Sequence, residues 1–211
     1  MNYSSTRFNE NLNIKKYPGV GLYDIPAIKP EKFEQVEFIP FNFCKTCPNP
    51  ERKGVHFFVH DYQFERLWRN LRKYVPLLSR FRACMTPDYS MYTDWPVAVQ
   101  IWNHYKKHYI GACLQENGVK VYPTISWSDE ASYKWCFDGE PINATVCISS
   151  VGTQKNEESK RLFIRGYDAM IEHLRPVTVI FYGTVPRECK GNIVRITAFQ
   201  EKFKEAKISG Y

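Results

Sequence analysis

The sequence has no long hydrophobic run, because no apolar stretch approaches the roughly 20 residues that a membrane-spanning helix requires. The first residues, MNYSSTRFNENLNIKKYPG, do not contain the apolar core of a signal peptide. A low-complexity tract is also absent. These absences exclude a membrane partner and predict a cytoplasmic protein.

Several motifs of well-known chemistry are missing as well. The chain lacks the GxxxxGK phosphate loop and the HExxH zinc motif. Its seven cysteines are an odd number scattered along the chain, which excludes the disulfide framework of a small secreted domain. Cys44 and Cys47 form a CxxC that has no second CxxC to complete a zinc knuckle. The identity of any cofactor therefore stays open at this stage.

The charge that is present is mostly positive. Lys and Arg total 29 against 22 acidic residues, which gives a net charge of +7, and aromatic residues make up 16% of the chain. Basic side chains gather in the segment FERLWRNLRKYVPLLSRFR and again in HYKKHY, His104 to Tyr109. A basic surface attracts polyanions, so we expect a nucleic-acid or nucleotide partner, with solvated helix faces as the alternative. The candidate contacts are Arg66, Arg69, Arg72 and Lys73.

A short apolar run followed by polar residues and an amphipathic stretch recurs along the chain. This pattern is typical of buried parallel strands with crossover helices, so we predict an α/β fold of β-α repeats, TIM-barrel-like and incomplete. Residues 1–53 would form a Pro-rich N-terminal arm with one short strand in VEFIPFNF, and residues 54–211 a single domain. Strands are expected within 55–61, 83–90, 119–129, 144–153, 177–184 and 193–199. Helices are expected at 63–79, 96–116, 129–137, 156–174 and 201–207.

Acidic residues follow several of these strands. The simplest interpretation of Asp61 and Asp129 is that they cap helices. Asp88, in contrast, lies in PDYSMYTD, too far from the next helix to cap it. The carboxyl ends of parallel strands share one rim, where such acids could hold a divalent cation as cofactor. Asp88, with Asp61 and Asp129 as companions, is therefore the candidate catalytic residue.

The segment SSVGTQKN has the composition of an anion site. It lies between a predicted strand and a predicted helix, so hydroxyls, free N–H groups and the helix dipole would converge on a phosphate. A turn without a ligand is the alternative. Aromatic rings at neighbouring strand ends, Tyr89 and Trp127, could stack on a base. The candidate phosphate ligands are Ser149, Ser150, Gly152, Thr153 and Lys155.

Several blocks between Gly54 and Gly183 read GVHFFVHD, PDYSMYTDWPVAVQIWN, NGVKVYPTISWSDEASYKWCFDG, ISSVG and FYG. In these blocks the chain resembles domain of unknown function 4417, a family of bacteria, phages and mobile elements. The resemblance implies a phage or mobile-element protein in the cytoplasm of a bacterial host, and it brings no particular activity. It also implies that the family's site includes Asp88, Ser90, Trp127, Ser128 and Asp129.

The residues and the resemblance together are consistent with three hypotheses for the function. The first hypothesis is a protein that binds nucleic acid or a nucleotide phosphate at the rim, in replication, regulation or counter-defence. The second is a metal-dependent phosphoesterase or nuclease that uses the rim acids. The third is an inhibitor that binds a host protein through the aromatic-rich arm.

Overall fold

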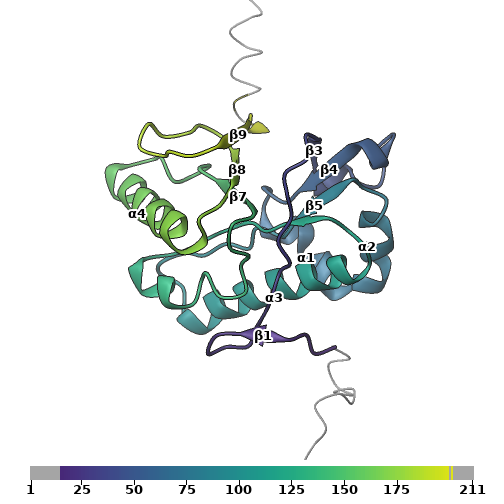
Figure 1. The fold of residues 1–211 in the computed structure, drawn as a ribbon, viewed down its shortest axis with the longest axis horizontal. Helices are drawn as coiled ribbons and strands as arrows, with labels where there is room; N and C mark the ends of the chain where they lie inside the picture. The colour runs from purple at the N-terminus through teal and green to yellow at the C-terminus, as the bar shows by residue number, and fades with distance from the viewer. Residues whose placement is uncertain (1–14, 200, 202–211) are drawn as a thin grey trace, which may run out of the picture.

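The computed structural model describes residues 15–199 and residue 201, and it shows parallel strands flanked by helices (Figure 1). The strands are β1 Gly19–Val20, β2 Ile25–Pro26, β3 Glu37–Pro40, β4 Lys53–His56, β5 Ala83–Met85, β6 Val121–Tyr122, β7 Thr145–Ser149, β8 Thr178–Tyr182 and β9 Ile193–Ile196. The α-helices are α1 Asp61–Arg69, α2 Leu71–Leu78, α3 Val97–Glu116 and α4 Glu157–Leu174, and the short 3-10 helices are η1 Phe41–Phe43, η2 Pro50–Arg52 and η3 Glu130–Lys134.

The parallel strands lie in two sheets that follow the order of the chain. One sheet has the order β3-β4-β5-β6 and the other β7-β8-β9, and every neighbouring pair in them is parallel. A single parallel bridge between Thr124 and Cys147 joins the two. The predicted parallel β-α architecture is confirmed. A closed barrel is not formed within the described residues, because β3 and β9 at the outer ends pair with no further strand.

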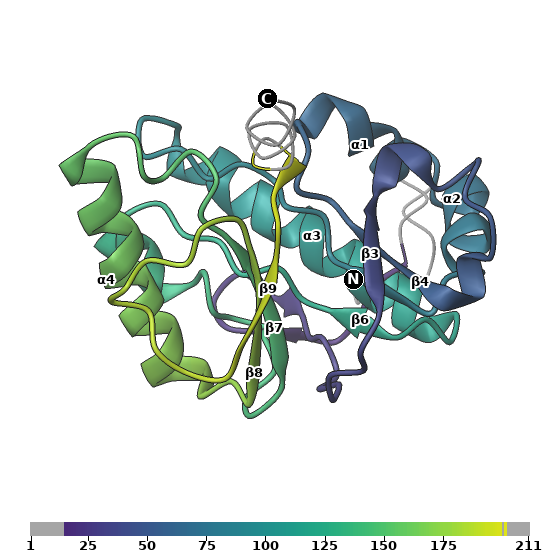
Figure 2. The ribbon, with the colours of Figure 1, turned by 90° about the horizontal axis from the view of Figure 1, so that it is seen from above.

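Side chains of β7 and β8 alternate between two apolar clusters. Val146, Ile148, Val179 and Phe181 pack with α4, whereas the residues between them point the other way. Cys147 and Ile180 thereby join the cluster that contains β4, β5 and β6. Figure 2 shows the result, with α4 outside β7–β9 and α1 and α2 outside β3–β6. Both sheets are therefore covered by helices, and this explains why their strands read as continuous apolar runs.

Two predicted helices differ from the observed ones. The helix expected at 63–79 is two helices, because Asn70 leaves the helical conformation and its side chain accepts the backbone N–H of Lys73 at 3.1 Å, which caps α2. The helix expected at 129–137 is only the 3-10 turn η3, capped by Asp129 through the N–H of Ala131 at 3.0 Å. The cap at Asp129 agrees with the interpretation of this residue as a helix cap, whereas the sequence pattern did not indicate the cap at Asn70.

The arm expected at residues 1–53 contributes directly to this architecture. Its predicted strand is β3, which is confirmed, and it pairs with β4 at the edge of the first sheet. Further back, the N–H of Ile28 donates to the carbonyl of Gly139 at 2.8 Å, and β2 lies against α3. Of the tail helix expected at 201–207, residues 202–207 lie outside the described residues. None of the described helices is long and apolar enough to cross a lipid bilayer.

Candidate functional site

A cavity of about 420 Å³ opens at the carboxyl ends of β5, β6 and β7. This volume falls within the range of small-molecule sites. The loop after each of the three strands supplies one part of the wall. The lining residues are Asp88–Thr93, Ile125–Ser128, Ser149, Val151, Gly152, Thr153, Lys155, Ser159, Leu162 and Phe163.

Asp88 is the carboxyl group in this wall. Burial raises its pKa to about 7, the nearby Asp61 carboxylate adds to this rise, and Lys107 opposes it. A carboxyl group with this pKa is populated in both its protonated and its ionised form near neutral pH. Asp88 can therefore donate a proton or accept one at the cavity surface.

The other two predicted acids lie outside the cavity lining. Asp61, the first residue of α1, accepts both the N–H and the hydroxyl of Ser90, each at 3.0 Å. Asn103 donates to the carbonyl of the same serine at 2.9 Å. Asp61 therefore positions the loop that carries Asp88, and Asp129 caps η3. Among the described residues these three acids do not form a group of metal ligands.

The loop between β7 and α4 carries the residues that the sequence predicts as phosphate ligands. Ser149, Gly152, Thr153 and Lys155 all line the cavity. Ser150 does not, because its hydroxyl turns inward and donates to the carbonyl of Thr184 at 2.7 Å. Glu157 and Glu158 occupy the first turn of α4, where their negative charges offset the positive end of the helix dipole. Any anion affinity here must therefore come from the loop and Lys155 rather than from the helix end.

The two predicted stacking residues differ in how much of their ring is exposed to the cavity. Tyr89 is buried, with the Lys106 ammonium 4.0 Å from its ring centroid and Phe64 edge-on at 5.0 Å. Trp127 is half-buried in the cavity wall and packs on α4, where its ring lies 5.6 Å from that of Phe163. Of these two rings, Trp127 is therefore the one that is accessible to a ligand.

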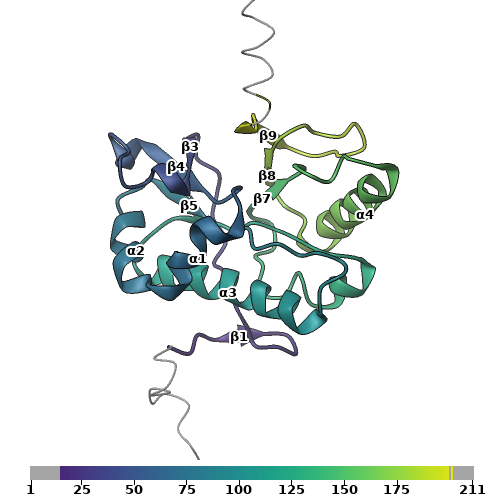
Figure 3. The same ribbon diagram turned by 180° about the vertical axis from the view of Figure 1, so that it is seen from behind.

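The predicted nucleic-acid contacts on the basic helices lie elsewhere. Arg66, Arg69, Arg72 and Lys73 are exposed on α1 and α2, and none of them lines the cavity. Arg66 lies 5.3 Å from the ring centroid of Phe41, which is part of η1. Figure 3 shows α1 and α2 on the side of the molecule away from α4. The basic face and the cavity are thus two separate surfaces.

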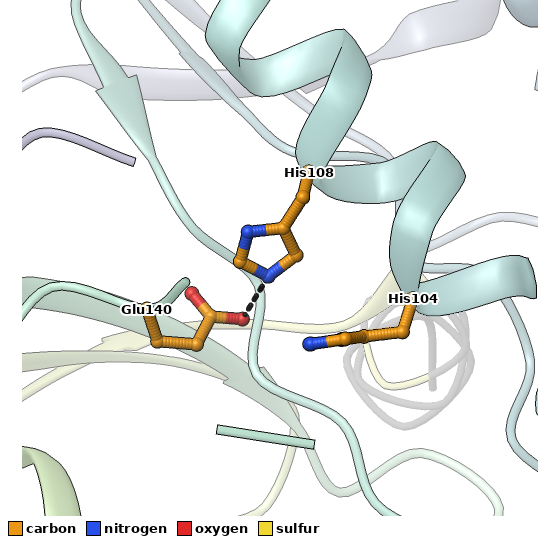
Figure 4. A group of neighbouring side chains, drawn as sticks. All are labelled: His104, His108 and Glu140. Atoms are coloured by element: carbon orange, nitrogen blue, oxygen red, sulfur yellow. Dashed lines mark hydrogen bonds and ion pairs between the residues drawn. The ribbon is translucent and has the colours of Figure 1, made fainter. Parts of the chain in front are cut away.

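A buried charge cluster lies close to the site, and its basic residues belong to HYKKHY, which the sequence analysis interpreted as a surface segment that binds a polyanion or faces solvent. Lys107 donates to the carboxylate of Glu140 at 2.7 Å and to the carbonyl of Thr124 at 2.8 Å. His108 lies 2.9 Å from the same Glu140 oxygen, and its other ring nitrogen lies 2.8 Å from the carbonyl of Pro26. Figure 4 shows His104 and His108 extending from α3 toward Glu140.

The sequence did contain a signal for this cluster. His104, Lys107, His108 and Gly111 have the spacing of one helical face, and Gly111 lies against Ile28 and Thr86 in the core. The basic composition of HYKKHY masked this periodicity. Burial holds the pKa of His104 well below its ordinary value, and Lys107 and His108 lower it further. The hydrogen bond with the backbone carbonyl of Asp138 acts in the opposite direction but does not outweigh them. Burial disfavours ionised Glu140, but His108 and Lys107 hold its pKa below the ordinary value.

His104, His108 and Glu140 have the residue types of a metal site. Their ligand atoms lie within 4.8 Å of one another, and one oxygen of Glu140 has no hydrogen-bond partner. The positive charge of the cluster, however, is already supplied by Lys107, whose side chain is 1% exposed. A divalent cation would add two further positive charges beside this buried ammonium, which is costly at low dielectric.

We therefore expect the cluster to be stable without metal. Addition of EDTA should leave the thermal midpoint unchanged, and elemental analysis of the purified protein should find far less than one zinc per chain. His104→Gln serves as the matched variant, since it removes one candidate ligand and replaces the imidazole by another neutral, polar side chain. A stoichiometric metal that is lost in His104→Gln would contradict this expectation.

Comparison with known proteins identifies relatives over most of the chain. The profile of the family described as Domain of unknown function (DUF4417) matches residues 17–200. The Gene 1 protein of Mycobacterium phage L5 is 32% identical over 169 residues, which cover 79% of this chain and 73% of the phage protein. The Gene 1 protein of Mycobacterium phage D29 is 31% identical over 175 residues, covering 82% of this chain and 65% of that protein, less than two thirds of its length. No solved structure matches.

Proposed function

We propose that this chain, which belongs to the family described as Domain of unknown function (DUF4417), binds the phosphate of a nucleotide or nucleic acid in the cavity beside Asp88. The relatives in two mycobacteriophages support a phage or mobile-element setting, in the cytoplasm of a bacterial host. Replication, regulation and counter-defence are the processes in which such a binder would act.

One observation carries the proposal. A single cavity is lined by residues from three different loops, and they supply a cation, several hydroxyls, an open indole ring and a titratable carboxyl group. Phosphate is bound by this combination of lysine, hydroxyl and backbone N–H donors. The chain order of the parallel strands supports an open, barrel-like frame, in which the carboxyl ends of the strands would carry the ligand site.

Replacing Lys155 by alanine is expected to weaken the binding of a phosphate ligand by at least about tenfold, because a charge-assisted hydrogen bond is worth about 1.5–3 kcal/mol. Isothermal titration calorimetry with AMP or inorganic phosphate measures this change. Lys134→Ala is the matched control, since Lys134 is also an exposed lysine but lies outside the cavity lining. Equal affinities of the two variants would contradict the proposal.

A second function is favoured by the pKa of Asp88, which burial raises to about 7. A carboxyl group of this pKa suits general acid–base catalysis at neutral pH, as in hydrolysis of a phosphoester. The predicted companions Asp61 and Asp129 are engaged in positioning and capping, so Asp88 would act without them. Hydrolysis that survives Asp88→Asn would exclude this second function.

A further inference from the structure

The cavity presents little positive charge to a ligand. Among the residues that the structure describes, Lys155 is the one basic residue in its lining, and Asp88 adds a carboxyl group. A nucleic-acid strand gains most of its affinity from several phosphates neutralised together by Lys and Arg. The basic residues that could do this, such as Arg69 and Arg72, belong to the separate α1–α2 face. The cavity therefore suits a ligand with one phosphate group.

Trp127 gives the cavity a fixed aromatic surface. A side chain on Gly166 of α4 would meet the indole nitrogen at 2.0 Å, so the absence of that side chain allows the indole to lie directly against the helix. Phe163 supports the same ring from a position one helical turn earlier. An aromatic ring held in this way can stack on any base, because every base has a π face.

The remaining lining contains polar side chains that the protein itself leaves unused. Within the described residues, the hydroxyls of Ser126 and Ser159 make no hydrogen bond, whereas that of Ser128 donates to Gln100 at 2.7 Å. Asp88 lies in the same lining. Free hydroxyls and a carboxyl group in the same lining as Lys155 and an aromatic ring match the sugar hydroxyls that separate a phosphate from its base.

From this arrangement we infer that the cavity binds a single nucleoside monophosphate, with its base stacked on Trp127 and its phosphate at the loop that carries Lys155. This inference rests on the phosphate site proposed above and names its ligand class. It distinguishes the cavity from the basic α1–α2 face, whose contact with nucleic acid remains a separate prediction.

The test is calorimetric titration of the full chain with the common ribonucleoside 5′-monophosphates, the corresponding nucleosides, inorganic phosphate and a short oligothymidylate that lacks a terminal phosphate. At least one monophosphate should bind about tenfold more tightly than inorganic phosphate, since stacking of a base contributes about 1–3 kcal/mol. Trp127→Ala should remove this advantage and leave phosphate binding unchanged. Trp127→Phe keeps a ring and should retain most of it, which separates stacking from loss of the fold.

The salt dependence gives a second readout. A monophosphate carries no condensed counterions to release, so its affinity should depend on salt concentration far less steeply than that of an oligonucleotide. If the monophosphates and inorganic phosphate bind equally well to the native protein and to Trp127→Ala, the inference fails and the phosphate site stands. If nothing with a phosphate binds, both fail. Tight, steeply salt-dependent binding of the oligothymidylate that Arg69→Ala with Arg72→Ala abolishes, with no binding of any monophosphate, would overturn the inference in favour of a strand on the α1–α2 face.

Discussion

Replacing Lys107 by methionine is expected to lower the free energy of unfolding by about 3–5 kcal/mol, which is the usual cost of removing one partner from a buried ion pair. The side chains of Lys107 and Glu140 are 1% and 0% exposed. Without the ammonium group, the Glu140 carboxylate keeps the ring nitrogen of His108 at 2.9 Å and already has an oxygen with no hydrogen bond. Chemical denaturation monitored by circular dichroism measures the loss.

Two further variants make this prediction specific. Lys160→Met is the matched control, because the Lys160–Glu188 pair is 38% and 45% exposed and should cost less than about 1 kcal/mol. The double variant Lys107→Met with Glu140→Gln should recover part of the stability, since it removes the buried charge along with its partner. A Lys107→Met protein as stable as Lys160→Met would show that the cluster does not stabilise the fold in this way.

Replacing Asp88 by asparagine is expected to stabilise the protein at about pH 8 and to have little effect below about pH 4. The pKa of Asp88 is raised by burial from 3.8 to about 7, so between these values the folded protein holds a proton that the unfolded chain has released. The free energy of unfolding therefore falls as pH rises through this interval. Since each tenfold change in acidity is worth about 1.4 kcal/mol, the penalty above pH 7 is at most about 4 kcal/mol.

Unfolding curves recorded across this pH range test the prediction. Asp94→Asn is the control, because Asp94 is an exposed carboxylate on the same loop. Its pH dependence of stability should match that of the native protein, whereas the curve for Asp88→Asn should be flatter. If Asp88→Asn raised the free energy of unfolding by the same amount at every pH, the stabilisation would come from packing and not from the ionisation of Asp88. A stabilising replacement at a cavity residue is the pattern expected when a site is kept for binding or catalysis.

The sequence predicted the placement of the strands because buried parallel strands leave a direct pattern of apolar runs with polar ends. The same pattern predicted that Asp88 follows one strand and that Ser149 and Lys155 belong to the end of another, and the structure places all three in one cavity lining. The pattern does not predict the direction in which each side chain points. Ser149 faces the cavity and Ser150 turns to Thr184, although the two are adjacent and chemically identical.

The buried cluster was the larger omission, and its cause is physical. Lysine is rarely buried, so a basic segment such as HYKKHY is ordinarily assigned to a solvated helix face. Lys107 is buried because Glu140, more than thirty residues away in sequence, comes to lie 2.7 Å from its ammonium group. A contact of this kind depends on the tertiary fold, and the spacing of His104 and His108 alone does not specify it. The break between α1 and α2 at Asn70 likewise depends on one side-chain hydrogen bond.

Hydrogen–deuterium exchange, measured with and without a nucleoside monophosphate such as AMP, tests the central claim most directly. Binding in the cavity should slow exchange in the loops at 88–93, 125–128 and 149–155, and should leave α1 and α2 unchanged. Lys155→Ala should remove the protection at the same ligand concentration. Protection confined to α1 and α2, or none in these loops at saturating concentrations of every common monophosphate and of inorganic phosphate, would contradict the assignment of this cavity as a phosphate-binding site.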